Sequence, residues 1–292
     1  MQYLDNYLKQ LSLDIYREIC DKKIVYFDVK YWVYLRDQNT EIQKELATRL
    51  TELLDNNKCV FPISETTFWE IMKQDEDRRK VTFELVDKFS QGLTIIDGQE
   101  RMSSEFYYWI QNLQKIEGLI EPKRLIWSNV HFSVNRNFYA DKARLLDENL
   151  QRQFFEFSRK FSICDVFRLN PGSIPPFKYK DNIDALNEGK EKYKHENSTF
   201  DEMFFSEVGG TLDVFREQIK DVMAICMSEH FKRELSNEEL TKIDPTPYCN
   251  LIYHSFKLKK ITTELPLLKI YSSLHAQLRW NKQRKYKMAM TL

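Results

Sequence analysis

The fold of this chain is decided by the stretch Ile24-Val25-Tyr26-Phe27-Asp28-Val29-Lys30-Tyr31-Trp32-Val33-Tyr34-Leu35. Four apolar, mostly β-favouring residues run directly into Asp28, without alternating polar positions, which predicts a central strand over residues 24–28 that is buried on both faces. Asp28 then lies at the carboxyl end of that strand, where open parallel sheets bind ligands, so it is a candidate catalytic or metal-binding group. The alternative is that Asp28 caps a short helix over residues 30–36.

A second stretch, from Cys59 to Lys73, repeats this pattern of a short apolar strand that turns into a helix. We expect a strand over residues 59–63 and a helix over residues 65–74 with Ser64 as its N-cap. Glu70 falls beside the apolar stripe of that helix. An exposed Glu on a helix is usually solvated, but next to Asp28 it would form part of a carboxylate cluster for a hard divalent cation.

The elements around these stretches extend the alternation of strands and helices. The apolar spacing predicts helices over residues 1–20, 40–57 (with Thr40 as N-cap) and 77–90, and a third strand over residues 93–96. Alternation at this spacing is typical of a parallel sheet with helices on both faces, and therefore of the α/β class.

Together the two stretches resemble the start of a PIN domain, the metal-dependent nuclease family named after the PilT N-terminus. The matching features are the strand ending in Asp28, the aromatic helix and the long amphipathic helix after it, the strand Val60-Phe61-Pro62-Ile63-Ser64, and Glu70 on the following helix. The resemblance covers residues 20–98. It implies a PIN-like parallel sheet flanked by helices, with Asp28 and Glu70 in an acidic cluster that binds Mg²⁺ or Mn²⁺, and we expect Ser64 to orient the groups around the metal.

The chain after residue 98 has a different character. Dense aromatic residues without clear alternation predict a mostly helical insertion over residues 99–245, with helices near 101–114, 140–168 and 206–233 and a loop at 170–176. A C-terminal segment over residues 246–292 follows, with helices near 249–258 and 266–281. We therefore expect a PIN-like portion over residues 1–98, the helical insertion, and the start of a second PIN half.

The C-terminal segment is basic, although the whole chain balances 44 Lys and Arg against 44 Asp and Glu. Interleaved aromatic residues make this segment suitable for a phosphate backbone with unstacked bases, so single-stranded RNA is the expected partner. The alternative is a solvated helical face. The residues expected to bind nucleic acid are Arg279, Lys282, Arg284, Lys285 and Lys287.

Composition excludes several other classes of protein. With only 7 Gly there is no GxGxxG or Walker-type loop, and the five isolated Cys and scattered His make a zinc site unexpected. The cysteines are expected to be reduced thiols, several of them buried, in a cytoplasmic protein. No apolar run reaches membrane-spanning length, so no membrane partner is expected. A homo-oligomer is left open.

The acidic cluster that the resemblance implies is incomplete within the sequence. Long members of the family carry, after a similar basic helix, an Asn-Asp segment and further acids, which do not occur before Leu292. Asp97 could substitute as an acid, although a turn role before Gly98 competes with that interpretation. Three explanations of the missing acids are open: the chain is truncated, its site is built differently, or the protein is inactive. The two hypotheses are an RNA-cleaving nuclease and a catalytically incomplete PIN-like module that binds nucleic acid or a protein partner.

Overall fold

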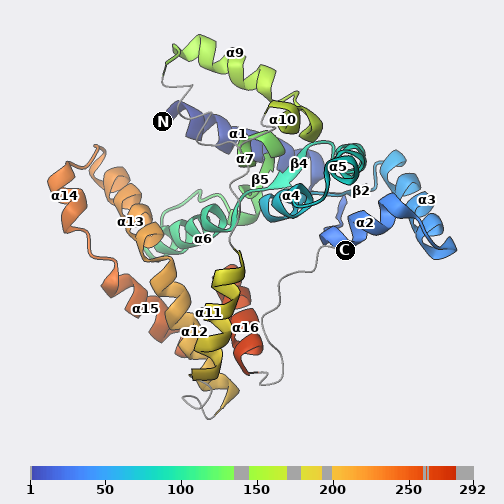
Figure 1. Cartoon of the computed structure of the whole chain (residues 1–292). Coiled ribbons are helices and arrows are strands. Elements are labelled where there is room, and N and C mark those ends of the chain that lie inside the picture. Colours follow the sequence, from blue (N-terminus) through green and yellow to red (C-terminus); the bar gives the residue numbers. More distant parts are fainter. Residues whose placement is uncertain are drawn as a thin grey trace. The chain divides into compact units, whose positions relative to one another are not determined.

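The computed structural model describes residues 2–134, 145–169, 179–192, 199–258, 261 and 263–280 (Figure 1). The chain divides into two compact units. Unit 1 comprises the described parts of Met1–Asp97 and Lys123–Pro175, and unit 2 those of Gly98–Pro122 and Pro176–Met290. These units differ from the division at residues 98 and 245 that the sequence predicts. The described residues between 123 and 175 belong to the same unit as the N-terminal portion.

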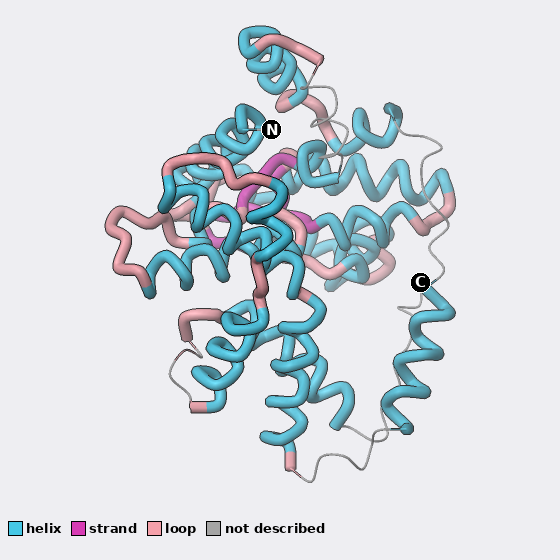
Figure 2. Tube along the Cα trace, turned by 90° about the vertical axis from the view of Figure 1, so that its left-hand side faces the viewer, coloured by secondary structure: helices cyan, strands magenta, loops and turns pink. Residues whose placement is uncertain are grey.

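Unit 1 contains all the strands of the described residues, and each strand is only two or three residues long. Figure 2 shows them as short magenta segments among the helices. In chain order the elements are α1 (Gln2–Ile19), β1 (Lys23–Ile24), α2 (Val29–Asp37), α3 (Glu41–Asp55), β2 (Cys59–Val60), β3 (Ile63–Ser64), α4 (Glu65–Met72), α5 (Glu76–Ser90), β4 (Leu93–Ile95), the 3-10 helix η1 (Pro122–Arg124) at the boundary between the units, β5 (Trp127–Asn129), α7 (Val130–Val134), α9 (Glu148–Ser158) and α10 (Ile163–Leu169).

The strands form two small sheets, a parallel one of two strands and a mixed one of three strands. β1 pairs with β2 in parallel, and β3 pairs with β4 in parallel, with Ile63 opposite Thr94. β5 then joins β4 in antiparallel direction, with Trp127 opposite Ile95. The fold is therefore mixed α/β and mostly helical, and the described residues do not form the continuous parallel sheet that the sequence predicts.

Helices pack on both faces of these strands, as the sequence predicts. Phe61 and Ile63 face a core with residues of α2, α3, α4 and α5. Val60 and Ile95 face a second core, formed mainly with α1 and α9. Successive side chains of a strand point to opposite faces, so even these short strands separate two apolar layers.

The prediction of a central strand over residues 24–28 is wrong. β1 is a two-residue strand at the edge of its sheet, and Ile24 and Tyr26 are 48% and 49% exposed. Val25 and Phe27 are half-buried and pack against the core. The segment therefore alternates between solvent and core like an edge strand, although every residue before Asp28 is apolar or aromatic.

Local signals explain where the other N-terminal elements begin and end. Thr40 and Gln43 form a reciprocal capping box at the start of α3, as expected for an N-cap Thr. The predicted strand over residues 59–63 is divided into β2 and β3, since Pro62 has no N–H to donate to a ladder. α5 ends at Gln91, which has a left-handed conformation, followed by Gly92 with a φ of 77°.

Unit 2 is entirely helical in its described residues. Its elements are α6 (Gly98–Leu113), α11 (Tyr179–Lys192), α12 (Phe200–Val214), α13 (Arg216–Phe231), α14 (Asn237–Lys242), α15 (Thr246–Lys257) and α16 (Pro266–Trp280). One core joins α6, α12, α13, α15 and α16, and Phe106, Ile219 and Phe256 are completely buried in it. This unit buries its own apolar faces without a sheet.

Several elements after residue 98 differ from the prediction. The helix expected over 206–233 is two helices that meet at Phe215, whose buried ring belongs to the core. In place of one helix over 140–168, the described part contains α9 and α10 with a break at residues 159–162. β5 was not predicted, because three residues are too few to show a period. The expected loop at 170–176 lies outside the described residues.

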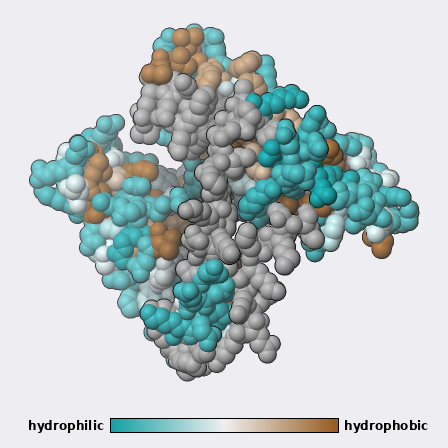
Figure 3. Space-filling view, viewed as in Figure 1, coloured by the Kyte–Doolittle hydropathy of each residue, from teal (hydrophilic) through white to brown (hydrophobic). Residues whose placement is uncertain are grey.

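Most of the coloured atoms in Figure 3 are hydrophilic, and one of the groups of hydrophobic atoms lies at the top, where α9 lies. Leu145, Leu150 and Phe157 are exposed in this region of unit 1. In the part of the chain that the structure describes, no helix combines the length and the apolar character needed to cross a lipid bilayer.

Candidate acidic site

Asp28 occupies the N-cap position of α2, but its carboxylate does not cap that helix. The residue has an extended conformation (φ −66°, ψ 152°), its side chain is exposed, and no backbone N–H of α2 donates to its carboxylate. Its carbonyl oxygen accepts the N–H of Tyr31 at 2.9 Å, so only the backbone contributes to the start of the helix. The capping role therefore does not account for an aspartate here.

Glu70 lies near the end of α4 and is half-buried. Burial raises the pKa of its carboxyl group above the ordinary value of 4.5, and the Asp28 carboxylate raises this pKa further, while Lys73 lowers it. The effect of Asp28 means that the two carboxylates lie close enough for their charges to interact. The structure thus brings together the two acids that the sequence singles out.

A hydroxyl cluster connects the segment before Asp28 to the start of α4. The Tyr26 hydroxyl lies 2.8 Å from Oγ of Ser64 and 2.8 Å from Oγ1 of Thr67. Ser64 also accepts the backbone N–H of Thr67 at 3.2 Å, as its predicted N-cap role requires. These contacts join a residue two positions before Asp28 to a residue three positions before Glu70, and so they help to fix the two acids relative to each other.

Phe27 anchors the same segment from its buried side. Its ring stacks on Phe61 with centroids 5.6 Å apart and meets Trp32 edge to face at 5.3 Å. Because adjacent residues of an extended segment point in opposite directions, burying Phe27 directs Asp28 outward. The aromatic residues around Asp28 thus determine its orientation.

The donor type of the pair fits a divalent cation, but the number of acids is small. Carboxylate oxygens are the ligands that Mg²⁺ prefers, and Mg²⁺ often uses one or two carboxylates together with water and substrate phosphate. Asp97 is half-buried two residues after β4. Over the described residues, however, no group of three or more His, Cys, Asp or Glu side chains is arranged to hold a metal ion.

Of the residues expected to bind nucleic acid, the structure describes only Arg279. Its guanidinium forms an ion pair with Glu207 on α12, and the two side chains are 23% and 12% exposed. A guanidinium engaged in this way has fewer donors available for phosphate. Lys282, Arg284, Lys285 and Lys287 lie outside the described residues.

Burial describes the histidine of α7 and most of the cysteines. His131 is completely buried in α7, and burial lowers the pKa of its imidazole to about 3. All five cysteines are free thiols, and Cys59, Cys226 and Cys249 are buried, as expected for structural cysteines.

The fold and this site define a mixed α/β chain with a paired-carboxylate site, one acid at the start of α2 and the other on α4. Comparison with protein-family models, with curated proteins and with solved structures found no match. The function is therefore argued from the acid pair and its surroundings.

Proposed function

We propose that this protein is a metal-dependent, PIN-like nuclease that hydrolyses phosphodiester bonds, with RNA as its substrate. The observation that carries the proposal is the electrostatic interaction of Asp28 with Glu70: the Asp28 carboxylate, together with burial, raises the pKa of the Glu70 carboxyl group. Paired acids of this kind are common where a divalent cation binds.

The roles of the residues follow from their positions. Asp28 and Glu70 would bind Mg²⁺ or Mn²⁺ through their carboxylate oxygens. The bound cation would activate water and stabilise charge on the phosphate. Ser64 acts indirectly, since its hydroxyl is engaged with Tyr26 and Thr67 and so holds the start of α4 in place. The basic residues from Lys282 to Lys287 are proposed to contact the RNA backbone.

A second candidate function is that of a catalytically incomplete PIN-like module that binds nucleic acid or a protein partner. The observation that favours it is the absence, among the residues that the structure describes, of a third acid close to the pair. Such a module would retain RNA binding but would show no cleavage in Mg²⁺ or Mn²⁺.

Substitution of the two acids distinguishes these functions. Cleavage of a single-stranded RNA with a fluorophore and a quencher is measured in Mg²⁺, in Mn²⁺ and in EDTA. We expect Asp28→Asn and Glu70→Gln each to lower the metal-dependent rate by more than the roughly 10- to 100-fold typical of a group that only supports a metal ligand. Both substitutions retain side-chain size, so the melting temperature should change little for Asp28→Asn.

Two exposed acids of unit 1 provide matched controls. Asp21→Asn and Glu84→Gln make the same chemical changes on exposed side chains that do not contribute to the pKa shift of Glu70, and both should cleave at the wild-type rate. Cleavage by Asp28→Asn at the wild-type rate would contradict the nuclease. Metal-independent RNA binding without cleavage by the wild-type protein would establish the second function instead.

A further inference from the structure

Unit 2 contains a pocket that is independent of the acid pair. Its wall is formed by α13, by α15, and by the C-terminal end of α6 together with the residues that follow it. The volume of the pocket is about 580 Å³. Binding sites for small molecules typically measure about 300–1,000 Å³. The pocket is therefore large enough for a ligand of two or more rings.

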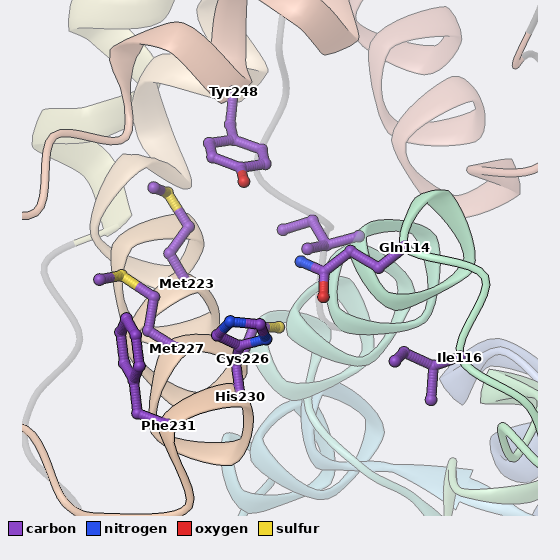
Figure 4. A pocket seen from close by; sticks show the side chains of 9 residues that line it. Gln114, Ile116, Met223, Cys226, Met227, His230, Phe231 and Tyr248 are labelled. Atoms are coloured by element: carbon purple, nitrogen blue, oxygen red, sulfur yellow. The ribbon is translucent and has the colours of Figure 1, made fainter.

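Apolar and polarisable side chains form most of the wall. Met223 and Met227 stand one turn apart on α13, with Phe231 after them and Ile116 on the opposite side (Figure 4), and Ile110 also lines the pocket. Methionine is unbranched and polarisable, so it adapts to a ligand's shape and makes favourable contacts with aromatic rings. These residues favour an apolar, aromatic ligand.

Three polar side chains face the same space from different elements. Figure 4 shows the Tyr248 hydroxyl of α15 and the Gln114 amide directed into the pocket, with the His230 ring of α13 beneath them. The described lining includes no Asp, Glu, Lys or Arg. A charged group buried there would lose its hydration without a compensating partner. The lining therefore favours a neutral ligand with hydrogen-bonding atoms along one edge.

A hydrogen-bonded cluster fixes the wall made by α6 and α13. The Tyr107 hydroxyl donates to Glu229, lying 2.9 and 2.8 Å from its two carboxylate oxygens, and Gln111 donates to Oε2 of Glu229 at 2.6 Å. Burial and Glu229 raise the pKa of Tyr107 to about 12, so Tyr107 remains a donor at neutral pH. Because Glu229 is adjacent to His230 on α13, this cluster orients the wall before any ligand binds, which lowers the cost of binding.

The thiol in the pocket is not a reactive group. Cys226 is 5% exposed, and burial raises its pKa to about 12, with Glu229 as a smaller contribution. A thiol that stays protonated is a poor nucleophile. Binding in the pocket is therefore non-covalent.

We propose that this pocket is a binding site for a neutral, mostly apolar aromatic small molecule with a hydrogen-bonding group at one edge. Met223, Met227 and Phe231 contact its rings, and Gln114 and Tyr248 bond its polar edge. This site and its ligand do not depend on the nuclease proposal.

The test uses N-phenyl-1-naphthylamine, a neutral two-ring fluorophore with one N–H donor, whose emission rises in an apolar site. It is titrated into the full chain and compared with 1-anilinonaphthalene-8-sulfonate, which adds one negative charge to the same rings. We expect saturable binding of the neutral probe and at least about tenfold weaker binding of the sulfonate. Equal affinity for the two probes would overturn the proposed ligand class.

Two pairs of variants locate the site. Met227→Trp fills the pocket and should weaken the neutral probe at least about tenfold, whereas Ile225→Trp, at a 51% exposed position of the same helix outside the lining, should not. If Met227→Trp does not fold, a second pair of variants replaces it. Ile116→Asp, at a 48% exposed position of the lining, should then weaken binding of the neutral probe, whereas Leu113→Asp, at a 51% exposed position outside the lining, should not. Equal effects within the deciding pair would overturn the site.

Tyr248→Phe tests the polar edge separately, because it removes one hydroxyl and retains the ring. Loss of one hydrogen bond should weaken binding roughly two- to tenfold for a probe that bonds Tyr248. An affinity equal to that of the wild-type protein would show that the ligand's polar edge does not lie against Tyr248, and this part of the proposal would be wrong.

Discussion

Asp28 and Glu70 stand in an arrangement that structure alone does not require. Asp28 makes no capping hydrogen bond to α2, and the pKa of Glu70 is raised by burial and by the Asp28 carboxylate. The raised pKa means that the surroundings of Glu70 disfavour its ionised form. Functional sites commonly retain groups whose environment disfavours their ordinary charge, since a ligand then supplies the compensating interaction.

Glu70 should therefore lower the stability of the metal-free protein at neutral pH. Because its pKa is raised in the folded state, its contribution to stability is fully present below its unfolded pKa and is lost as pH rises through the folded pKa. We expect the melting temperature of Glu70→Gln to rise relative to wild type as pH increases from below 4.5 to neutral. In wild type, Mn²⁺ at ten times its Kd should add about 1.4 kcal/mol.

Thermal melts of both proteins across this pH range, with and without Mn²⁺, measure both effects. Glu84→Gln serves as the control, because it removes an exposed carboxylate and should keep the wild-type response to Mn²⁺. The same Mn²⁺ response in Glu70→Gln as in wild type would place the cation elsewhere.

At the scale of single residues, the sequence draws attention to the two acids but not to the hydrogen bonds around them. Asp28, Ser64 and Glu70 can be selected because each has a recognisable position at the end of a strand or in the first turns of a helix. Tyr26 and Thr67 could not, since their hydrogen bond spans 41 positions and no local pattern encodes it. Tyr26 resembles any strand residue until the tertiary contact is known.

At the scale of elements, one helix start in unit 2 depends on a buried carboxylate from another helix. Glu105 of α6 is 7% exposed, and its two carboxylate oxygens accept the N–H of Leu267 at 2.9 and 3.0 Å. α16 begins at Pro266, so Leu267 carries the first N–H of the helix. When it is ionised, the Glu105 carboxylate also interacts favourably with the positive end of the α16 helix dipole.

Burial outweighs these hydrogen bonds and raises the pKa of Glu105 to about 7 from an ordinary 4.5. The stability that it contributes is therefore present below 4.5 and is lost as pH rises through 7. Glu105→Gln retains an acceptor for Leu267 but does not ionise. We expect its free energy of unfolding to rise relative to wild type between pH 5 and pH 8, by on the order of 2–3 kcal/mol, as measured by denaturant unfolding.

Glu105→Ala distinguishes the capping hydrogen bond from the ionisation of Glu105. It removes both the acceptor for the Leu267 N–H and the ionisable group, so it should lower the free energy of unfolding at pH 5 by about 1 kcal/mol or more. Parallel pH profiles for wild type and Glu105→Gln would show that Glu105 does not titrate in this range.

The elements that the sequence predicted well are those whose signals are local. Thr40 with Gln43, Ser64, and Gln91 with Gly92 mark helix ends through hydrogen bonds or conformations within a few residues. The strands were harder, because two or three residues show no period and their direction depends on distant partners. Likewise, the break at Phe215 follows from packing in the core of unit 2 and not from a helix-breaking residue.

At the scale of the whole molecule, the two proposed sites belong to different units, each with its own core. The acid pair rests on the core around Phe61 in unit 1, and the pocket is built on the core around Phe106 in unit 2. Unit 2 takes its α6 from one part of the chain and its other helices from a later part, with residues 123–175 of unit 1 between them. Sequence order alone therefore does not give this division.

The separate cores predict that damage to one unit leaves the other site working. Phe61 and Phe106 are both completely buried, and replacing either with Ala should cost about 3–5 kcal/mol. Phe61→Ala removes the ring on which Phe27 stacks, so it should raise hydrogen exchange in α2, α4 and α5 and weaken Mn²⁺ binding while the neutral probe still binds. Phe106→Ala should raise hydrogen exchange in α6, α13 and α16, and it should weaken binding of the neutral probe but not binding of Mn²⁺. Hydrogen exchange read by mass spectrometry, together with both titrations, tests this, and a rise in exchange throughout the chain for either variant would show that the two units unfold as one.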